Sequence, residues 1–284
     1  MGETTAIAWT DRTFNGWIGC ERVSPGCQHC YAEQLDKRVG GYGRRVDAEG
    51  RPVLNWGKHA PRYRTSEANW REPLRWDAAA AKAGRPTLVF CSSLADVFED
   101  RAELAPWRED LFELIERTPN LIWQLLTKRP QNVLGMVPVR WLEIVRLRRT
   151  WPSNVWIGTT VEDQQRADER LPELLRIPAP VRFLSCEPLL GPVDIDEWLC
   201  DSLFTSRKGI EGFYPALDWV IVGGESGPGH RPLDLAHAGS LVEQCERAGV
   251  PVFFKQVGGR TPAAGGDVLD GRRIKQFPPE APRG

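Results

Sequence analysis

Residues 154–185 read NVWIGTTVEDQQRADERLPELLRIPAPVRFLS and contain one complete β-α-β unit. The apolar runs Asn154–Thr159 and Val181–Ser185 predict two strands, and the amphipathic stretch Glu162–Arg176 predicts the helix that joins them. Neither run alternates between apolar and polar residues, which is typical of parallel strands buried on both faces. The stretch therefore predicts an α/β fold built on a parallel sheet.

The same alternation of strand and helix continues on both sides of this unit. Further strands are predicted at Thr87–Cys91, Leu121–Leu126, Asp218–Val222, Pro251–Lys255 and either Ala6–Trp9 or Phe14–Ile18. Further helices are predicted at Glu103–Arg117, Pro138–Thr150 and Leu235–Ala248, with a short one at Asp194–Leu199. No hairpin signal interrupts the series, which favours a partial or complete parallel (β/α) barrel over an open doubly wound sheet.

One stretch stands apart from this rhythm. Residues 36–77 contain ten Lys/Arg and six Asp/Glu, a charge of +4, so the rest of the chain carries −5 of the net −1. Trp56, Trp70 and Trp76 lie in the same stretch. We expect a single barrel domain over residues 1–258, in which the Arg/Trp-rich residues 39–76 form an insertion or lid. Residues 259–284 are rich in Gly and Pro and are expected to form an irregular, poorly packed tail.

Composition narrows the cellular setting. The chain has 284 residues, 41% of them hydrophobic, and no apolar run approaches the ~18 residues of a membrane span. The first thirty residues also lack the pattern of a secretory signal. An odd count of seven cysteines suits a reducing compartment better than a disulfide scaffold. We therefore expect a cytoplasmic protein that does not associate with a membrane.

The cysteines themselves carry the strongest chemical signal. Residues 19–32 read GCERVSPGCQHCYA, so Cys20, Cys27 and Cys30 lie within eleven residues of a loop that contains Pro25 and Gly26. Three thiolates that converge in this way select zinc, copper(I) or an iron–sulfur cluster. Structural zinc needs a fourth ligand, which would be His29 or a remote residue. Core cysteines without a ligand are the plain alternative.

Polar residues follow six of the predicted strands. They are Ser92, Ser93 and Asp96; Thr127, Lys128 and Arg129; Thr160 and Glu162; Ser185, Cys186 and Glu187; Gly223, Gly224, Glu225 and Ser226; and Lys255 and Gln256. The carboxyl ends of barrel strands carry the chemistry of such folds, although loops are also polar simply because they meet water. Gly223 and Gly224 would let the backbone approach a ligand, or would only form a tight turn.

The position of the cysteine loop after the first strand of such a barrel resembles the radical S-adenosylmethionine superfamily. The chain from Ile7 to Gly258 also resembles a family of bacteriophage and prophage proteins with this three-cysteine motif. The phrases that carry this second resemblance are LTKRP (126–130), GTTVE (158–162), FLSCEPLLGP (183–192), VIVGGESG (220–227) and FFKQ (253–256). Two features depart from the superfamily pattern. Six residues rather than three separate Cys20 from Cys27, and the Gly-Gly-Glu motif follows a late strand instead of the second.

The resemblance implies an enzyme in which Cys20, Cys27 and Cys30 hold a [4Fe–4S] cluster that reduces S-adenosylmethionine to a 5′-deoxyadenosyl radical. It further implies an external electron donor, and a nucleotide, DNA or RNA is the expected substrate. With it we expect contacts to S-adenosylmethionine from Ser92, Asp96, Thr160, Glu162, Gly223, Gly224 and Glu225. Catalytic roles are expected for Glu187, Lys128 and Lys255.

Two other functions use the same residues differently. A nucleic-acid-binding protein would keep zinc or a cluster as a structural site and grip a strand through the Arg/Trp stretch, with Arg62 and Arg64 on the phosphates. The plain reading of that stretch is a solvated face whose tryptophans cover the barrel. A hydrolase-like barrel would use Glu187 and Glu225 as acid and base.

Overall fold

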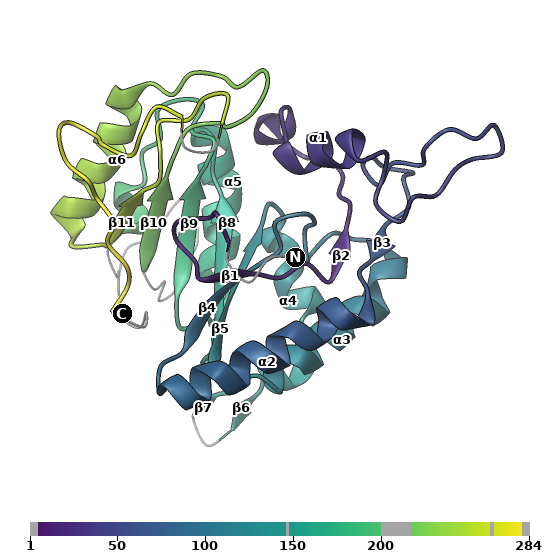
Figure 1. Cartoon of the computed structure of the whole chain (residues 1–284). Helices are drawn as coiled ribbons and strands as arrows, with labels where there is room; N and C mark the ends of the chain where they lie inside the picture. The colour runs from purple at the N-terminus through teal and green to yellow at the C-terminus, as the bar shows by residue number, and fades with distance from the viewer. Residues whose placement is uncertain (1–4, 146–147, 200–216, 262–263, 280–284) are drawn as a thin grey trace.

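The chain folds around one parallel sheet of seven strands that curls into a half-barrel (Figure 1). A computed structural model describes residues 5–145, 148–199, 217–261 and 264–279. The strands follow one another in chain order: β1 (Arg12–Thr13), β4 (Thr87–Cys91), β5 (Leu121–Thr127), β8 (Val155–Thr160), β9 (Arg182–Cys186), β10 (Trp219–Val222) and β11 (Val252–Phe254). Every neighbouring pair is parallel. The predicted α/β class and parallel sheet are confirmed, in the form of a partial barrel.

Helices cover the convex face of this sheet. They are α2 (Glu67–Ala83), α3 (Ala105–Glu116), α5 (Gln164–Leu175) and α6 (Leu235–Ala248), with a short α4 (Val133–Met136), whereas α1 (Tyr31–Arg38) lies apart from them (Figure 1). The predictions of α3, α5 and α6 are confirmed, and Asp234 and Gly249 cap α6 as the sequence indicates. The short helix expected at Asp194–Leu199 is the 3-10 turn η5 (Asp196–Trp198).

Two expectations about local structure are wrong. The described residues of the stretch 138–150 do not form the predicted helix. They contain the 3-10 turn η4 (Val139–Trp141) and the antiparallel strands β6 (Ile144–Val145) and β7 (Arg148–Arg149), because β-branched neighbours favour strand over helix. The first strand of the sheet, β1, lies between the two stretches proposed for it. The second stretch instead supplies β2 (Trp17–Ile18), which pairs with β3 (Tyr63–Arg64).

The Arg/Trp-rich stretch divides into two structural parts. Residues 67–76, expected within the lid, form the first half of α2, which Ser66 caps and Gly84 ends. Trp70 of this helix is buried edge-on against Phe14, so it belongs to the core. Only residues 39–66 remain outside the regular layers, and they project as an arm beside α1 (Figure 1).

The concave face of the half-barrel is filled at its amino end by aromatic side chains. These are Trp9, Phe90, Trp156, Phe183, Trp219 and Phe253. The tail packs against the sheet, contrary to expectation. Phe277 stacks on Trp219 of this aromatic cluster with ring centres 5.4 Å apart, whereas Leu269 and Ile274 are buried in the core on the helix side. The concave face is therefore closed at one end, and its carboxyl edge is the part that carries polar groups.

Candidate functional site

The three cysteines lie in one loop over the carboxyl edge of the sheet. This cysteine loop, residues 19–30, runs from the end of β2 through the 3-10 turn η1 (Pro25–Cys27) to the start of α1, where Cys30 occupies the cap position. Gly19 begins it with φ +117°, and a Cβ there would lie 2.4 Å from the carbonyl oxygen of Asn55. Only glycine can make this entry into the loop.

Hydrogen bonds tie the cysteine loop to the ends of four strands. Tyr31, which directly follows the loop, donates its hydroxyl to the carbonyl of Ser93 after β4 (2.8 Å). Arg129, after β5, donates to the carbonyl of Glu21 (3.0 Å) and contacts the Cys20 sulfur (3.8 Å). Gly26 donates its N–H to Glu162 after β8 (3.1 Å). The fourth link comes from the turn that follows β10.

That fourth link is a cluster around the carboxylate of Glu225. Arg231 donates to both carboxylate oxygens from its side chain and also donates its backbone N–H, while His29 lies 3.1 Å from Oε2. The same guanidinium reaches the carbonyl of Pro25. Burial raises the pKa of Glu225, but the hydrogen bonds from Arg231 and His29 outweigh it and lower the pKa overall. A carboxylate held ionised in this way is a poor general acid.

Asp96 and Glu162 have arginine partners of their own. Asp96 accepts from Arg129 at 2.8 Å and from the Thr127 hydroxyl at 2.7 Å. Glu162, 0% exposed, pairs with Arg170 of α5 at 2.9 Å. Three of the residues expected to touch a cofactor, Asp96, Glu162 and Glu225, therefore support the cysteine loop through ion pairs, directly or through an arginine.

The electrostatic surroundings of the sulfurs are mixed. Burial raises the pKa of the Cys20 thiol to about 12. The charge of Asp96 raises this pKa further, and the charge of Arg129 lowers it. Burial also raises the pKa of Cys30, while the backbone N–H groups of Glu33 and Ala32 and the charge of Lys128 oppose it. Cys30 occupies the cap position of α1, and the amino end of a helix favours a thiolate electrostatically.

The donor set fits an iron–sulfur cluster. Three partly exposed thiols share one loop, and the cations Arg22, Lys128 and Arg129 act on them electrostatically, which suits thiolate ligands to an anionic centre. Over the described part of the chain, no three His, Cys, Asp or Glu side chains are placed to hold a single metal ion. His29, the sequence candidate for a fourth zinc ligand, has its Nδ1 at Glu225.

Residues 4–278 match the family described as "Protein of unknown function (DUF5131)". The chain belongs to the DUF5131 family. No curated protein and no solved structure shows a significant match to it. The match spans the half-barrel, the cysteine loop and the packed tail of this family member together. No helix in the described ranges is long and apolar enough to cross a membrane.

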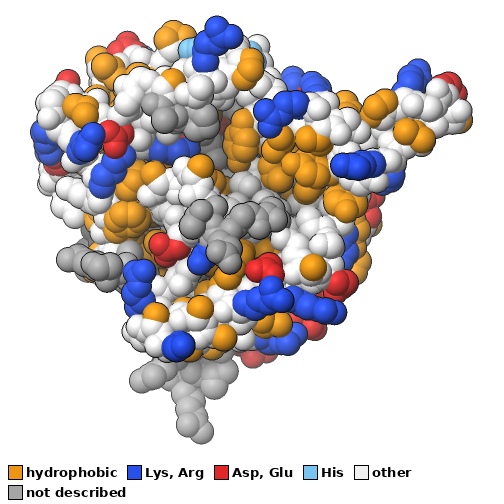
Figure 2. Space-filling view, in the orientation of Figure 1, with side chains coloured by type: hydrophobic (Ala, Val, Ile, Leu, Met, Phe, Trp, Pro, Cys, Tyr) orange, Lys and Arg blue, Asp and Glu red, His pale blue; other side chains and the backbone are white. Residues whose placement is uncertain are grey.

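A second group of predicted residues shares the concave face at the carboxyl edge. Side chains alternate along a strand, and Phe90, Leu126, Trp156, Phe183, Ile221 and Phe253 pack on the concave side. The same alternation places on that side Lys128, Thr160, Ser185, Glu187, Gly223 and Lys255. We call this set the concave edge. Figure 2 shows the surface recessed between the α6 side and the α1 side of the molecule, in the view of Figure 1.

Interactions within the concave edge centre on Glu187. Its carboxylate pairs with the ammonium of Lys255 and lies 3.3 Å from the side-chain amide of Gln256. Ser92 does not belong to this edge: its side chain lies beside Cys91 and donates its hydroxyl to the buried Asn15 at 2.7 Å. Below these residues the Phe183 ring packs over the backbone of Gly158, where a Cβ would lie 2.3 Å from the ring.

The two glycines after β10 have different roles. A Cβ on Gly224 would lie 1.8 Å from the carbonyl oxygen of Val257, so Gly224 is required by the neighbouring chain. A Cβ on Gly223 would meet Lys255, Gln256 and Glu187 at 3.4–3.7 Å, which is ordinary contact. Close backbone approach at Gly224 thus serves packing, and only Gly223 belongs to the concave edge.

Three residues of this site escaped sequence reasoning. Asn15, Arg170 and Arg231 each bind a predicted residue but lie outside the strand ends, and nothing in their spacing marks them. Asn15 accepts from the hydroxyls of Ser92 and Ser93 and from the N–H of Leu94. A buried Asn between Phe14 and Gly16 was the one available signal.

One of the two predicted phosphate contacts of the Arg/Trp stretch is not available. The Arg62 side chain is 0% exposed, pairs with Glu99 at 2.6 Å and donates to the carbonyls of Asn55 and Ala60. Arg64 pairs with Asp110 and lies over the Trp70 ring, but its side chain is 27% exposed. The phosphate contact of Arg62 is therefore wrong, and that of Arg64 stays a prediction.

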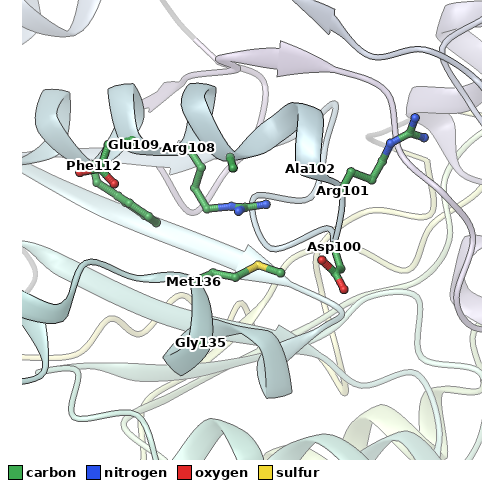
Figure 3. Close-up of a pocket in the computed structure, with 9 residues that line it drawn as sticks. Asp100, Arg101, Ala102, Arg108, Glu109, Phe112, Gly135 and Met136 are labelled. Atoms are coloured by element: carbon green, nitrogen blue, oxygen red, sulfur yellow. The ribbon is translucent and has the colours of Figure 1, made fainter.

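A separate depression of about 450 Å³ lies between α3 and α4 (Figure 3). Its lining includes Asp100, Arg101, Arg108, Glu109 and Met136, none of which belongs to the cysteine loop or the concave edge. Arg108 donates to the carbonyls of Val97 and Glu99, so its charge holds the loop after β4. We assign this depression no role in the chemistry.

Proposed function

We propose that this protein is an iron–sulfur enzyme of the radical S-adenosylmethionine type, with its cluster on Cys20, Cys27 and Cys30. The observation that carries the proposal is the attachment of a three-thiol loop to four strand ends at the carboxyl edge of a parallel half-barrel. Buried ion pairs fix the loop from below, which is the support that a cluster with an open iron position requires.

When bound, a [4Fe–4S] cluster and S-adenosylmethionine together supply a 5′-deoxyadenosyl radical that removes a hydrogen atom from a substrate. The chain's own residues hold and orient the reactants. Of the predicted cofactor contacts, Thr160 and Gly223 remain on the concave edge. Lys128, Glu187 and Lys255 share that edge, where they can bind the substrate or move a proton between Glu187 and Lys255.

The setting follows from this chemistry. An enzyme of this kind takes electrons from an external donor and works in the reducing cytoplasm, where its thiols stay free. We keep a nucleotide, DNA or RNA as the proposed substrate. The half-barrel would then be of the radical S-adenosylmethionine type.

Anaerobic turnover tests the proposal. Protein reconstituted with iron and sulfide is reduced with dithionite in the presence of S-adenosylmethionine, and 5′-deoxyadenosine is measured by mass spectrometry. We expect 5′-deoxyadenosine from the native chain and from Cys245→Ser, whose cysteine is buried in α6. We expect none from Cys27→Ser. No 5′-deoxyadenosine from a cluster-loaded native chain would refute the enzyme activity.

A further inference from the structure

The charges at the carboxyl edge are almost completely paired. Five of the carboxylates that follow strands each have a cationic partner. The pairs are Asp96 with Arg129, Glu99 with Arg62, Glu162 with Arg170, Glu187 with Lys255 and Glu225 with Arg231. Within the described ranges, Lys128 is a cation of this edge with no such carboxylate partner.

The ammonium of Lys128 has no hydrogen bond or ion pair with any residue that the structure describes, although its side chain is half-buried. Its backbone N–H donates to Asp96, which fixes the residue at the end of β5. The charge of Lys128 acts on the Cys30 thiol, so the ammonium lies toward the cysteine loop. A partly desolvated cation without a counter-charge is costly unless a ligand supplies one.

Two buried hydroxyls lie beside Lys128 on the same face. Thr160 is 1% exposed and Ser185 is 2% exposed, and the two are register partners on β8 and β9. Thr127, the neighbour of Lys128, is paired with Thr159, so Lys128 and Thr160 lie at the same level of adjacent strands. No hydrogen bond joins either hydroxyl to another described residue, and neither oxygen is among the fully buried side-chain atoms that lack a partner. Both oxygens therefore keep some access to the concave edge, where a ligand can accept their hydrogen bonds.

We propose that Lys128, Thr160 and Ser185 form a binding site for the anionic oxygen group of a ligand, a phosphate or a carboxylate. The lysine would supply the charge and the two hydroxyls would supply short directional hydrogen bonds. Glu187 is neutralised by Lys255, so no free carboxylate on the concave edge opposes an anion. The inference deepens the proposed function and rests on it for the choice of ligand, but the site itself needs no cluster to bind an anion.

Thermal unfolding of the full chain in inorganic phosphate tests the site. The unfolding midpoint is measured as sodium phosphate replaces sodium chloride at constant ionic strength, for the native chain, Lys128→Met, Thr160→Val and Lys82→Met. Phosphate also stabilises proteins by exclusion from their surface, and this effect is common to all variants. The difference between variants therefore reports on the site.

We expect Lys128→Met to weaken the site-specific effect of phosphate about tenfold or more, the value of one lost charged hydrogen bond, and Thr160→Val to weaken it in the same direction. Lys82→Met, which removes an exposed charge from α2, should match the native chain. Equal phosphate response in the native chain, Lys128→Met and Thr160→Val would overturn the site.

Two further arms identify the source of the anion. Saturating S-adenosylmethionine on reconstituted protein abolishes the Lys128-dependent response if its carboxylate occupies the site, and leaves it intact if the site serves a substrate phosphate. The Cys27→Ala chain separates this proposal from the proposed function. It should keep the Lys128-dependent response whether or not the native chain binds a cluster, and loss of that response there would contradict a site that needs no cluster.

Discussion

The carboxylate of Glu162, at the end of β8, accepts a hydrogen bond from the backbone N–H of Gly26, 3.1 Å away in the cysteine loop. A Cβ on Gly26 would also lie 3.1 Å from this carboxyl group, which is tighter than an ordinary van der Waals contact. The loop backbone therefore packs directly against the Glu162 carboxylate. Since Glu162 is itself fixed by Arg170, the position of the loop is set by a buried ion pair of the barrel. Loop geometry and barrel stability are therefore coupled at this point.

Glu162→Gln should reveal this coupling. The change leaves the nearly buried guanidinium of Arg170 without a counter-charge, which costs about 3 kcal/mol of unfolding free energy. Urea denaturation measures the loss. The control is Glu169→Gln, an exposed residue of α5, the helix that carries Arg170. It should change the free energy of unfolding by less than about 0.5 kcal/mol. Equal stability of the two variants would show that Glu162 does not anchor the loop.

The adjacent glycines after β10 should respond differently to alanine. Gly224→Ala drives a Cβ into the carbonyl oxygen of Val257 and should cost about 3 kcal/mol, because backbone must move. Gly223→Ala makes only ordinary contacts and should cost less than about 1 kcal/mol. Thermal or urea unfolding separates them. A larger loss for Gly223→Ala would contradict the roles assigned here.

Acid should loosen the link at Glu225. Its pKa is lowered in the folded chain, so its stabilisation is present above the unfolded pKa of about 4.3 and is lost as pH falls through the folded value. Compared with Glu225→Gln, the native chain should be more stable by about 1–2 kcal/mol at neutral pH, and the gap should close below about pH 4. Unfolding free energies measured between pH 3 and about 7 follow it. A gap that persists in acid would contradict this account.

Sequence patterns predicted the strands because their apolar runs are continuous. Six of the seven sheet strands follow such runs, and α6 follows from its spacing and its caps. Helical spacing of apolar residues was a less reliable guide than continuous apolar runs. Residues 138–150 carry apolar residues at helical spacing, yet the chain there forms a short turn and a two-stranded ribbon. Likewise α2 was hidden because its tryptophans and arginines resembled a surface insertion.

The sequence identified polar residues of the carboxyl edge, but it did not identify the ion pairs that some of them form. Strand ends correctly marked Asp96, Glu162 and Glu225 as polar groups near the cysteines. Their partners Arg129, Arg170 and Arg231 come from a loop, a helix and a turn, and such pairing depends on three-dimensional distance that no local spacing encodes. Only when those pairs are known can Lys128 be recognised as a cation without a carboxylate partner among the described residues.

Replacing Arg62 should lower the stability of the fold and leave its affinity for nucleic acid unchanged. Arg62→Met leaves the buried carboxylate of Glu99 with only a distant contact to Arg129 at 4.0 Å, and should cost about 3 kcal/mol of unfolding free energy. Arg71→Met, on the exposed face of α2, is the control for loss of charge. Fluorescence polarisation with labelled oligonucleotides should give equal affinities for the folded variants. A selective loss of binding in Arg62→Met would restore the phosphate-contact interpretation.

Metal and sulfide analysis of the anaerobically purified chain decides whether Cys20, Cys27 and Cys30 hold an iron–sulfur cluster. We predict iron and acid-labile sulfide in equal amounts in the native chain, their loss in Cys27→Ala, and their retention in Cys245→Ala, since Cys245 is buried in α6 away from the loop. Zinc without sulfide, or the same iron content in native and Cys27→Ala chains, would contradict a cluster on Cys20, Cys27 and Cys30.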